Sequence, residues 1–127
     1  MAWQMPLDEQ GKPDFGPVIR TSLQAWRASD PAAEVVNVGG RRDLLDADFV
    51  HLKGIKALNM SWCNQAGITD EAFKSLEGIH TLNMSSCSQA GITDEAFQSL
   101  KGIHTLDMRS CNQKSISGTS FIILQVF

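Results

Sequence analysis

The feature that most constrains this chain is a 24-residue segment that occurs three times in succession. Residues 66–89 and residues 90–113 agree at 19 of 24 positions, and residues 42–65 agree with residues 66–89 at 11 of 24. A period of this length is typical of proteins that stack one small structural unit on the next, because no unit buries its apolar face alone. The sequence therefore predicts a stack of repeats around one shared core.

The copies share apolar and small residues at fixed spacing. The run Ile79-x-x-Leu82-x-Met84 ends in apolar–polar alternation, which predicts a short strand with Leu82 and Met84 facing the core. Phe73 and Leu76 are three residues apart and fall on one face of a short helix. The shared positions are Phe49/Phe73/Phe97, Leu52/Leu76/Leu100, Gly54/Gly78/Gly102, Ile55/Ile79/Ile103, Leu58/Leu82/Leu106, Met60/Met84/Met108 and Cys63/Cys87/Cys111.

The helix boundaries also have sequence signals. Thr69 and Thr93 precede acidic pairs and are predicted N-caps, in a first turn where negative charge is favoured. Gly78 and Gly102 fall where each helix ends, at a position that favours a left-handed backbone. Each unit is therefore expected to contain one strand, a turn and one short helix.

The pattern Ile-x-x-Leu-x-Met-x-x-Cys followed by Ile-Thr-Asp-x-x-Phe-x-x-Leu resembles the cysteine-containing subfamily of leucine-rich repeats. The resemblance covers about residues 34–124. It implies an α/β leucine-rich-repeat solenoid, a short right-handed horseshoe with a parallel β-sheet on its concave face and short helices on its convex face. Many members are substrate-recognition parts of F-box ubiquitin ligases, and others are adaptors. The sequence departs from the family at the helix end, where Gly78 and Gly102 replace a longer segment.

We divide the chain into an N-terminal tail and capping helix (1–33) and the repeats (34–127), about three to four units with the last incomplete. Val36-Asn37-Val38 corresponds to Leu58-Asn59-Met60 and predicts a strand before the first full copy. The apolar residues of segment 17–30 have helical spacing, which predicts a helix that begins with Pro17 and shields the open end of the core. A second interpretation is that residues 23–31 resemble the last helix of an F-box.

The C-terminal end continues the repeat only in part. Ile116, Phe121 and Leu124 follow the 24-residue spacing, but the strand expected next does not appear in the sequence. An uncapped end exposes core and sheet edge, which favours association. Two interpretations stay open: a truncated or decayed fourth repeat, and an end through which the chain self-associates.

Strand residues that do not face the core are predicted to face the concave surface and to contact a protein partner. Trp62 is the foremost candidate because tryptophan is enriched among interface hot spots; the alternative is that Trp62 folds over its own loop and covers the core. His80 and His104 are expected about 5 Å apart on adjacent strands, as solvated residues or as a pair that senses pH. The predicted contact residues are Lys56, Asn59, Trp62, His80, Asn83, Ser85, His104, Asp107 and Arg109.

Cys63, Cys87 and Cys111 are expected to be structural, since the resemblance implies that each thiol fills a small buried slot at a strand exit. A column of three thiolates lacks the paired spacing and the fourth ligand of a zinc site, so we expect no metal. We also expect no cofactor and no catalytic residue, because the sequence has no glycine-rich phosphate loop, HExxH or GxSxG motif.

Composition disfavours several kinds of partner. The net charge is −3, whereas nucleic-acid-binding proteins usually carry a basic excess, so we expect no nucleic acid. No run approaches the roughly 20 apolar residues that span a bilayer, and the N-terminus does not resemble a signal peptide, so we expect no membrane. The odd number of cysteines, three, favours a reducing compartment, cytoplasmic or nuclear.

These features favour a protein–protein interaction module, and not an enzyme, that binds a partner of unknown identity through the concave surface. Two alternatives stay open. The first is a substrate-recognition fragment of an F-box-type ubiquitin ligase whose N-terminal helix contacts a Skp-type adaptor. The second is a truncated repeat fragment without an independent function.

Overall fold

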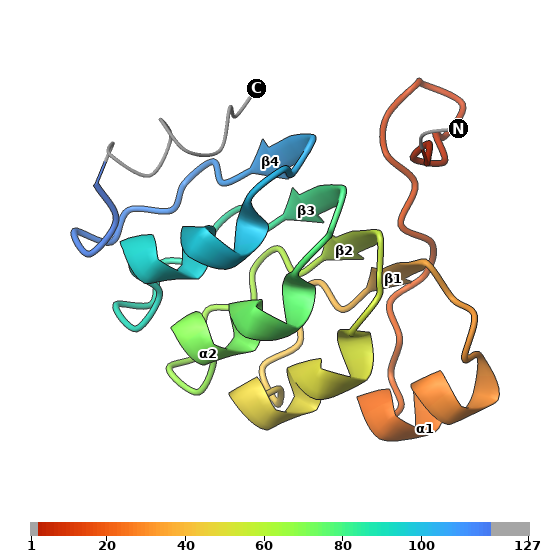
Figure 1. Cartoon of the computed structure of the whole chain (residues 1–127), viewed down its shortest axis with the longest axis horizontal. Helices are drawn as coiled ribbons and strands as arrows, with labels where there is room; N and C mark the ends of the chain where they lie inside the picture. Colours follow the sequence, from red (N-terminus) through yellow and green to blue (C-terminus); the bar gives the residue numbers. More distant parts are fainter. Residues whose placement is uncertain (1–2, 118–127) are drawn as a thin grey trace.

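The computed structural model describes residues 3–117, and its centre is a four-stranded parallel sheet. The strands lie in chain order, so each repeat adds one strand beside the previous one (Figure 1). They pair in register, which aligns Val36, Leu58, Leu82 and Leu106 across the sheet. The strands are β1 (Val35–Asn37), β2 (Ala57–Asn59), β3 (Thr81–Asn83) and β4 (Thr105–Asp107).

Short helices lie on one side of this sheet (Figure 1). Those labelled η are 3-10 helices, which are wound more tightly than α-helices and occur in proteins as short segments. The prediction of an α/β fold with a parallel sheet and short helices is therefore confirmed. The helices are α1 (Leu23–Ser29), η1 (Asp46–Leu52), α2 (Asp70–Phe73), η2 (Lys74–Leu76) and η3 (Asp94–Leu100).

The predicted helix boundaries agree with the structure. The Thr69 side chain accepts a hydrogen bond from the Glu71 amide, and Thr93 makes the same contact in the next repeat. Gly78 and Gly102 have φ angles of +82° and +84°. A side chain is strained in this left-handed region, so glycine suits the turn that ends each helix.

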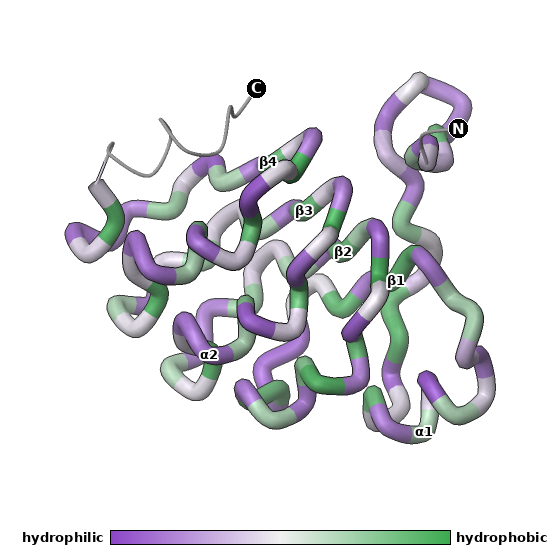
Figure 2. Tube along the Cα trace, viewed as in Figure 1, coloured by the Kyte–Doolittle hydropathy of each residue, from purple (hydrophilic) through white to green (hydrophobic). Residues whose placement is uncertain are grey.

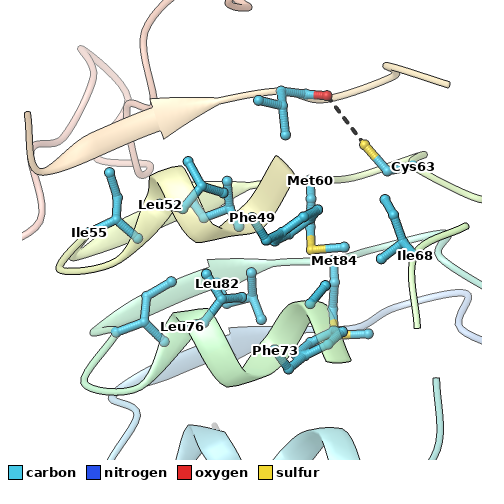
Figure 3. Close-up of a cluster of buried hydrophobic side chains, with 14 of the residues drawn as sticks. Phe49, Leu52, Ile55, Met60, Cys63, Ile68, Phe73, Leu76, Leu82 and Met84 are labelled. Atoms are coloured by element: carbon cyan, nitrogen blue, oxygen red, sulfur yellow. Dashed lines mark hydrogen bonds between the residues drawn. The ribbon is translucent and has the colours of Figure 1, made fainter. Parts of the chain in front are cut away.

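The core lies between the sheet and the helices. Phe49, Phe73 and Phe97 are at most 1% exposed. In Figure 3, Phe49 packs beside Met60, and Phe73 packs beside Met84 one repeat further on. Hydrophobic and hydrophilic stretches alternate along each stacked unit (Figure 2). Equivalent positions therefore form continuous apolar columns that no single repeat could bury.

A second set of contacts joins neighbouring repeats through polar groups, and the sequence did not predict it. Asp70 accepts hydrogen bonds from the amide and the hydroxyl of Thr93, at 2.7 and 2.6 Å. The pairs Asp46–Thr69 and Asp94–Ser117 repeat both bonds. Asp70 and Asp94 were expected only to favour a helix N-terminus, but they and Asp46 each link one repeat to the next.

The N-terminal helix is shorter than predicted. It begins at Leu23, where the Ser22 side chain accepts a hydrogen bond from the Ala25 amide at 3.1 Å, and not at Pro17. The Ile19 amide donates instead to the Asn37 carbonyl at 2.8 Å, which holds residues 18–20 beside β1. A serine cap and this bond to the sheet prevail over the helical spacing of the apolar residues.

Of the three C-terminal residues predicted to continue the repeat, Ile116 is partly buried against the core. The predictions for Phe121 and Leu124 lie outside the described residues.

Within residues 3–117, no helix has both the length and the apolar character needed to cross a membrane.

Candidate functional site

One face of the sheet packs on the core, and among residues 3–117 the other carries no helix. We call the latter the open face. Its central column consists of the last residue of each strand, aligned by the register: Asn37, Asn59, Asn83 and Asp107. All four side chains are half-buried. The open face therefore presents a line of amide groups that ends in a carboxylate.

Each column residue is held by the same local turn, because its side-chain oxygen accepts a hydrogen bond from the amide two residues later. The turn gives the four side chains a common orientation and leaves the nitrogen of each asparagine to face another partner. The bonds are Asn37–Gly39 at 2.9 Å, Asn59–Ser61 at 2.9 Å, Asn83–Ser85 at 3.0 Å and Asp107–Arg109 at 3.2 Å.

The fourth position differs from the others by an ion pair. The Arg109 guanidinium donates from Nε and Nη2 to the two Asp107 oxygens, at 3.0 and 2.8 Å. These hydrogen bonds lower the pKa of Asp107. The column therefore changes from neutral donors to a paired carboxylate at β4.

A second row lies at the strand starts. The His80 and His104 rings stack with centroids 4.5 Å apart, and the Trp3 ring meets the His80 ring in a T-shaped contact with centroids 5.0 Å apart. Burial lowers the pKa of His80, and the neighbouring charges of His104 and Lys56 lower it further. The two histidines are thus adjacent, as their spacing in the sequence predicted, and Trp3 extends the row.

Two strand residues expected on this surface are buried instead. Ala57 is fully buried and Thr81 is 3% exposed. Both side chains are short, and the Thr81 hydroxyl lies 2.6 Å from Nδ1 of His80. Both residues therefore expose too little side-chain surface to anchor a partner, although Thr81 contributes to the lining of the cleft described below.

The N-terminal segment, residues 3–17, lies on the side of the sheet away from the helices (Figure 1). It forms a turn closed by a β-bridge between Leu7 and Pro13. Its contact with the sheet includes a 2.8 Å hydrogen bond from Nδ2 of Asn37 to the carbonyl of Gly16. From the sequence this segment was expected to be only a tail, because its proline and glycine residues predict turns but not what the turns contact.

A cleft of about 800 Å³ separates the N-terminal segment from the open face. Lys12, Pro13 and Phe15 line one side, and residues of β2, β3 and β4 line the other. The sheet side includes Asn59, Asn83, Asp107 and Arg109, all of which the sequence predicted as contact residues, together with Thr81, Leu82, Thr105, Leu106 and Met108.

Trp62 lies outside this cleft, in the turn after β2. Its side chain is 61% exposed, so the interpretation that it covers the core is wrong. Its φ angle is +63°, a left-handed conformation that is rare for a bulky residue. Gly40, Ser86 and Ser110 occupy the equivalent turns, also with positive φ. The fold thus requires this conformation in every repeat, and Trp62 exposes a large aromatic surface despite the strain.

The remaining predicted contact residues do not line the cleft. Lys56 and Ser85 are half-buried and His104 is exposed. Lys56 lies near enough to His80 to lower its pKa.

The three thiols form a ladder between repeats. Cys63 donates to the Val38 carbonyl at 3.2 Å (Figure 3), Cys87 to Met60 at 3.1 Å, and Cys111 to Met84 at 3.0 Å. Burial raises the pKa of Cys63 to about 11 and of Cys87 to about 12. These thiols are protonated at neutral pH, which makes them poor nucleophiles and poor metal ligands.

Among residues 3–117, no group of histidine, cysteine and acidic side chains is placed to hold a metal ion. Comparisons of the chain with protein-family models, with curated proteins and with solved structures find no match. Function is therefore inferred from the residues of the open face and their geometry.

Proposed function

We propose that the chain is a leucine-rich-repeat solenoid and that it acts as a protein–protein interaction module through the open, concave face of its sheet. The solenoid assignment is supported by the 24-residue period, by four parallel strands in chain order and by helices on one side. The thiol ladder between repeats agrees with the cysteine-containing subfamily that the sequence resembles.

The cleft on the open face is the observation that carries the proposed function. Three consecutive strands contribute polar side chains to it, and Phe15 and Pro13 supply an apolar wall. Binding sites typically combine an apolar lining with a few well-placed polar groups. Trp62, exposed beside this face, offers a second contact of the kind that often dominates interface energetics.

The chemistry of the buried thiols, which lie outside the cleft, supports binding over catalysis. Burial keeps Cys63 and Cys87 protonated, and their thiols donate to backbone carbonyls of the preceding repeat. A nucleophile needs a base within hydrogen-bond reach, and these thiols are instead committed to the fold. Three unpaired cysteines also favour a reducing compartment, the cytoplasm or the nucleus.

The position of α1 supports a capping role for this helix. Its two large apolar residues, Leu23 and Trp26, are buried in the core. Arg27 fixes the helix to the first repeat by donating to the carbonyls of His51 and Lys53, at 2.8 and 3.2 Å. A Skp-type adaptor would therefore meet only the polar side of this helix.

The proposed function is tested by affinity capture from cell lysate with matched arginine variants. Ser85→Arg places a long cation on the open face, at a position where the next repeat already carries Arg109. Gln98→Arg places the same side chain at an exposed position of η3, on the helix side of the sheet. Partners held by the native chain and by Gln98→Arg, but lost by Ser85→Arg, are the expected result. Equal capture by both variants would contradict binding through the open face.

A further inference from the structure

The first asparagine of the column, Asn37, shows how such a residue holds a stretch of main chain on the open face, here the chain's own N-terminal segment. Oδ1 of Asn37 accepts from the Gly39 amide at 2.9 Å, and its Nδ2 donates to the main-chain carbonyl of Gly16 at 2.8 Å. Because Oδ1 must face an amide donor, the position of Nδ2 is also fixed. The oxygen thus maintains the turn, while the nitrogen binds the backbone of the N-terminal segment.

Asn59 and Asn83 repeat the first half of this arrangement. Each accepts from the amide two residues later, at 2.9 and 3.0 Å, and each lies in register with Asn37. Within residues 3–117, neither Nδ2 group donates a hydrogen bond to another residue. Two oriented amide donors, about 4.8 Å apart on neighbouring strands, therefore face the cleft beside the one that already holds a carbonyl.

The cleft gives a peptide room beside these donors. Its volume is about 800 Å³, and Asn59 and Asn83 lie on one side with Pro13 and Phe15 on the other. In an extended chain, successive side chains point to opposite faces, so a segment whose backbone contacts the sheet directs some side chains toward Phe15. This wall favours an apolar or aromatic side chain at such a position.

We propose, building on the interaction module proposed above, that the partner is an extended peptide segment gripped by its main chain. Asn59 and Asn83 donate to its backbone carbonyls, and an apolar side chain of the peptide packs against Phe15 and Pro13. Asp107 ends the row of donors, because its carboxylate has no N–H and is held by Arg109. The site thus recognises backbone conformation first and one apolar side chain second.

The test starts with phage-displayed random peptides selected on the full chain. A selected peptide is synthesised with a fluorescent label, and its Kd is measured by anisotropy. Asn59→Asp and Asn83→Asp keep the oxygen that accepts from the turn but remove the donor, and Asp107 shows that aspartate fits this backbone. Each variant is expected to weaken binding on the order of tenfold, through a lost hydrogen bond and repulsion between the carboxylate and the peptide carbonyl.

Asn64→Asp is the matched control. Asn64 is exposed, and its Oδ1 accepts from the Ser88 amide of the next repeat at 2.8 Å, so the change adds the same charge and likewise keeps an oxygen that accepts from a backbone amide. Its Kd is expected to stay within about twofold of native. In NMR spectra, added peptide should shift the side-chain amide signals of Asn59 and Asn83 but not those of Asn64.

Two further variants test the wall and the end of the donor row. Phe15→Ala should weaken peptide binding by about tenfold through lost apolar contact. Asp107→Asn combined with Arg109→Ser recreates, at the end of β4 and in the turn after it, the pair Asn83 and Ser85 of the preceding repeat, and should tighten binding severalfold. Tighter binding by Phe15→Ala would instead make the N-terminal segment a competitor of the peptide, and would overturn this proposal.

The outcomes separate this proposal from the proposed function on which it rests. If Ser85→Arg abolishes partner capture, but no peptide is selected or every selected peptide binds both Asn→Asp variants as tightly as native, the module stands and the peptide mode is wrong. If partner capture and peptide binding are both insensitive to Ser85→Arg, both proposals are wrong. Selective loss of the peptide on Asn59→Asp and Asn83→Asp supports both.

Discussion

Two nearly identical repeats have different surroundings in this molecule. We call residues 66–89 the central repeat and residues 90–113 the distal repeat. Met84 and Cys87 of the central repeat are fully buried, whereas Met108 and Cys111 of the distal repeat are only half-buried. The central repeat lies between two full repeats, and the distal one adjoins a full repeat on one side. Burial in a stacked fold is therefore set by the neighbours as much as by the residue.

The helices of the two repeats differ as well. The central repeat has a turn of α-helix, α2, before η2, whereas the distal repeat has only the 3-10 helix η3. Lys74 pairs with Glu71 at 2.9 Å across one helical turn, and Gln98 takes the place of this lysine in the distal repeat. The exposed ion pair favours the α-helical turn.

The largest contrast is expected from truncating the two methionines. Met84→Ala removes a fully buried side chain and should lower the free energy of unfolding by about 2–5 kcal/mol. Met108→Ala should have roughly half that effect, because the residue is half-buried. Urea unfolding of both variants measures the difference. Equal losses of unfolding free energy would contradict the claim that the neighbouring repeats determine how deeply each methionine is buried.

The thiol ladder should show the same order with smaller values. Cys87→Ser keeps a donor for the Met60 carbonyl but places a more polar group in an apolar slot, at a cost of about 1–3 kcal/mol. Cys111→Ser should cost less than about 1 kcal/mol, since that site is half-buried. Thermal unfolding under reducing conditions compares them; a larger loss at Cys111 would contradict the neighbour effect.

The aspartates that link the repeats form the next pair. Asp70→Asn replaces a charged acceptor of two hydrogen bonds from Thr93 with a neutral one, and should cost about 1–2 kcal/mol. Asp94→Asn acts on the exposed Ser117 and should cost less. Chemical denaturation of the two variants is the measurement, with Asp30→Asn as an exposed control outside these links.

The stacked histidines predict a pH effect. The pKa of His80 is lowered by burial and by nearby positive charge, so the unfolded chain binds this proton more readily than the folded one. Stability should therefore fall as the pH drops through about 6.5, the usual histidine value, toward the lower pKa of folded His80. His80→Gln should reduce this slope, and His104→Gln should raise the pKa of His80 in an NMR titration. An unchanged His80 pKa in the latter variant would contradict the coupling.

The smallest effect is expected at the strained turns, where the two repeats should respond alike. Ser86 and Ser110 have φ angles of 59° and 62°. Replacing either with glycine relieves the left-handed strain, partly offset by backbone entropy, for a gain of about 0.5–1 kcal/mol. Differential scanning calorimetry should give the same increase in Tm for both. Unequal gains would show that the strain depends on the neighbouring repeats.

The repeated interior could be predicted from the sequence, because each interior position occurs three times with the same chemistry. Phe73, Met84 and Cys87 face the core for reasons of spacing that a single chain already displays. Thr69 and Gly78 mark helix ends through strictly local rules. Periodicity and local conformation were sufficient for these features.

The N-terminal segment could not be predicted, because nothing in it repeats. Its place over the open face depends on single long-range contacts, such as Asn37 with Gly16 and Trp3 with His80. For the same reason, the sequence did not predict that Phe15 lines the cleft or that α1 begins only at Leu23. Four of the predicted contact residues, Asn59, Asn83, Asp107 and Arg109, line the cleft, but the sequence did not indicate what lies opposite them.

The amide hydrogen-exchange rates of Cys87 and Cys111 test the effect of neighbouring repeats most directly. Both amides donate to the carbonyl of the methionine three residues earlier, at 3.2 Å in each case. Their local hydrogen bonds are therefore equal, and only the surrounding repeats differ. A stacked fold predicts that the Cys87 amide exchanges more slowly, by at least about tenfold after correction for intrinsic rates. Equal rates, or slower exchange at Cys111, would contradict it.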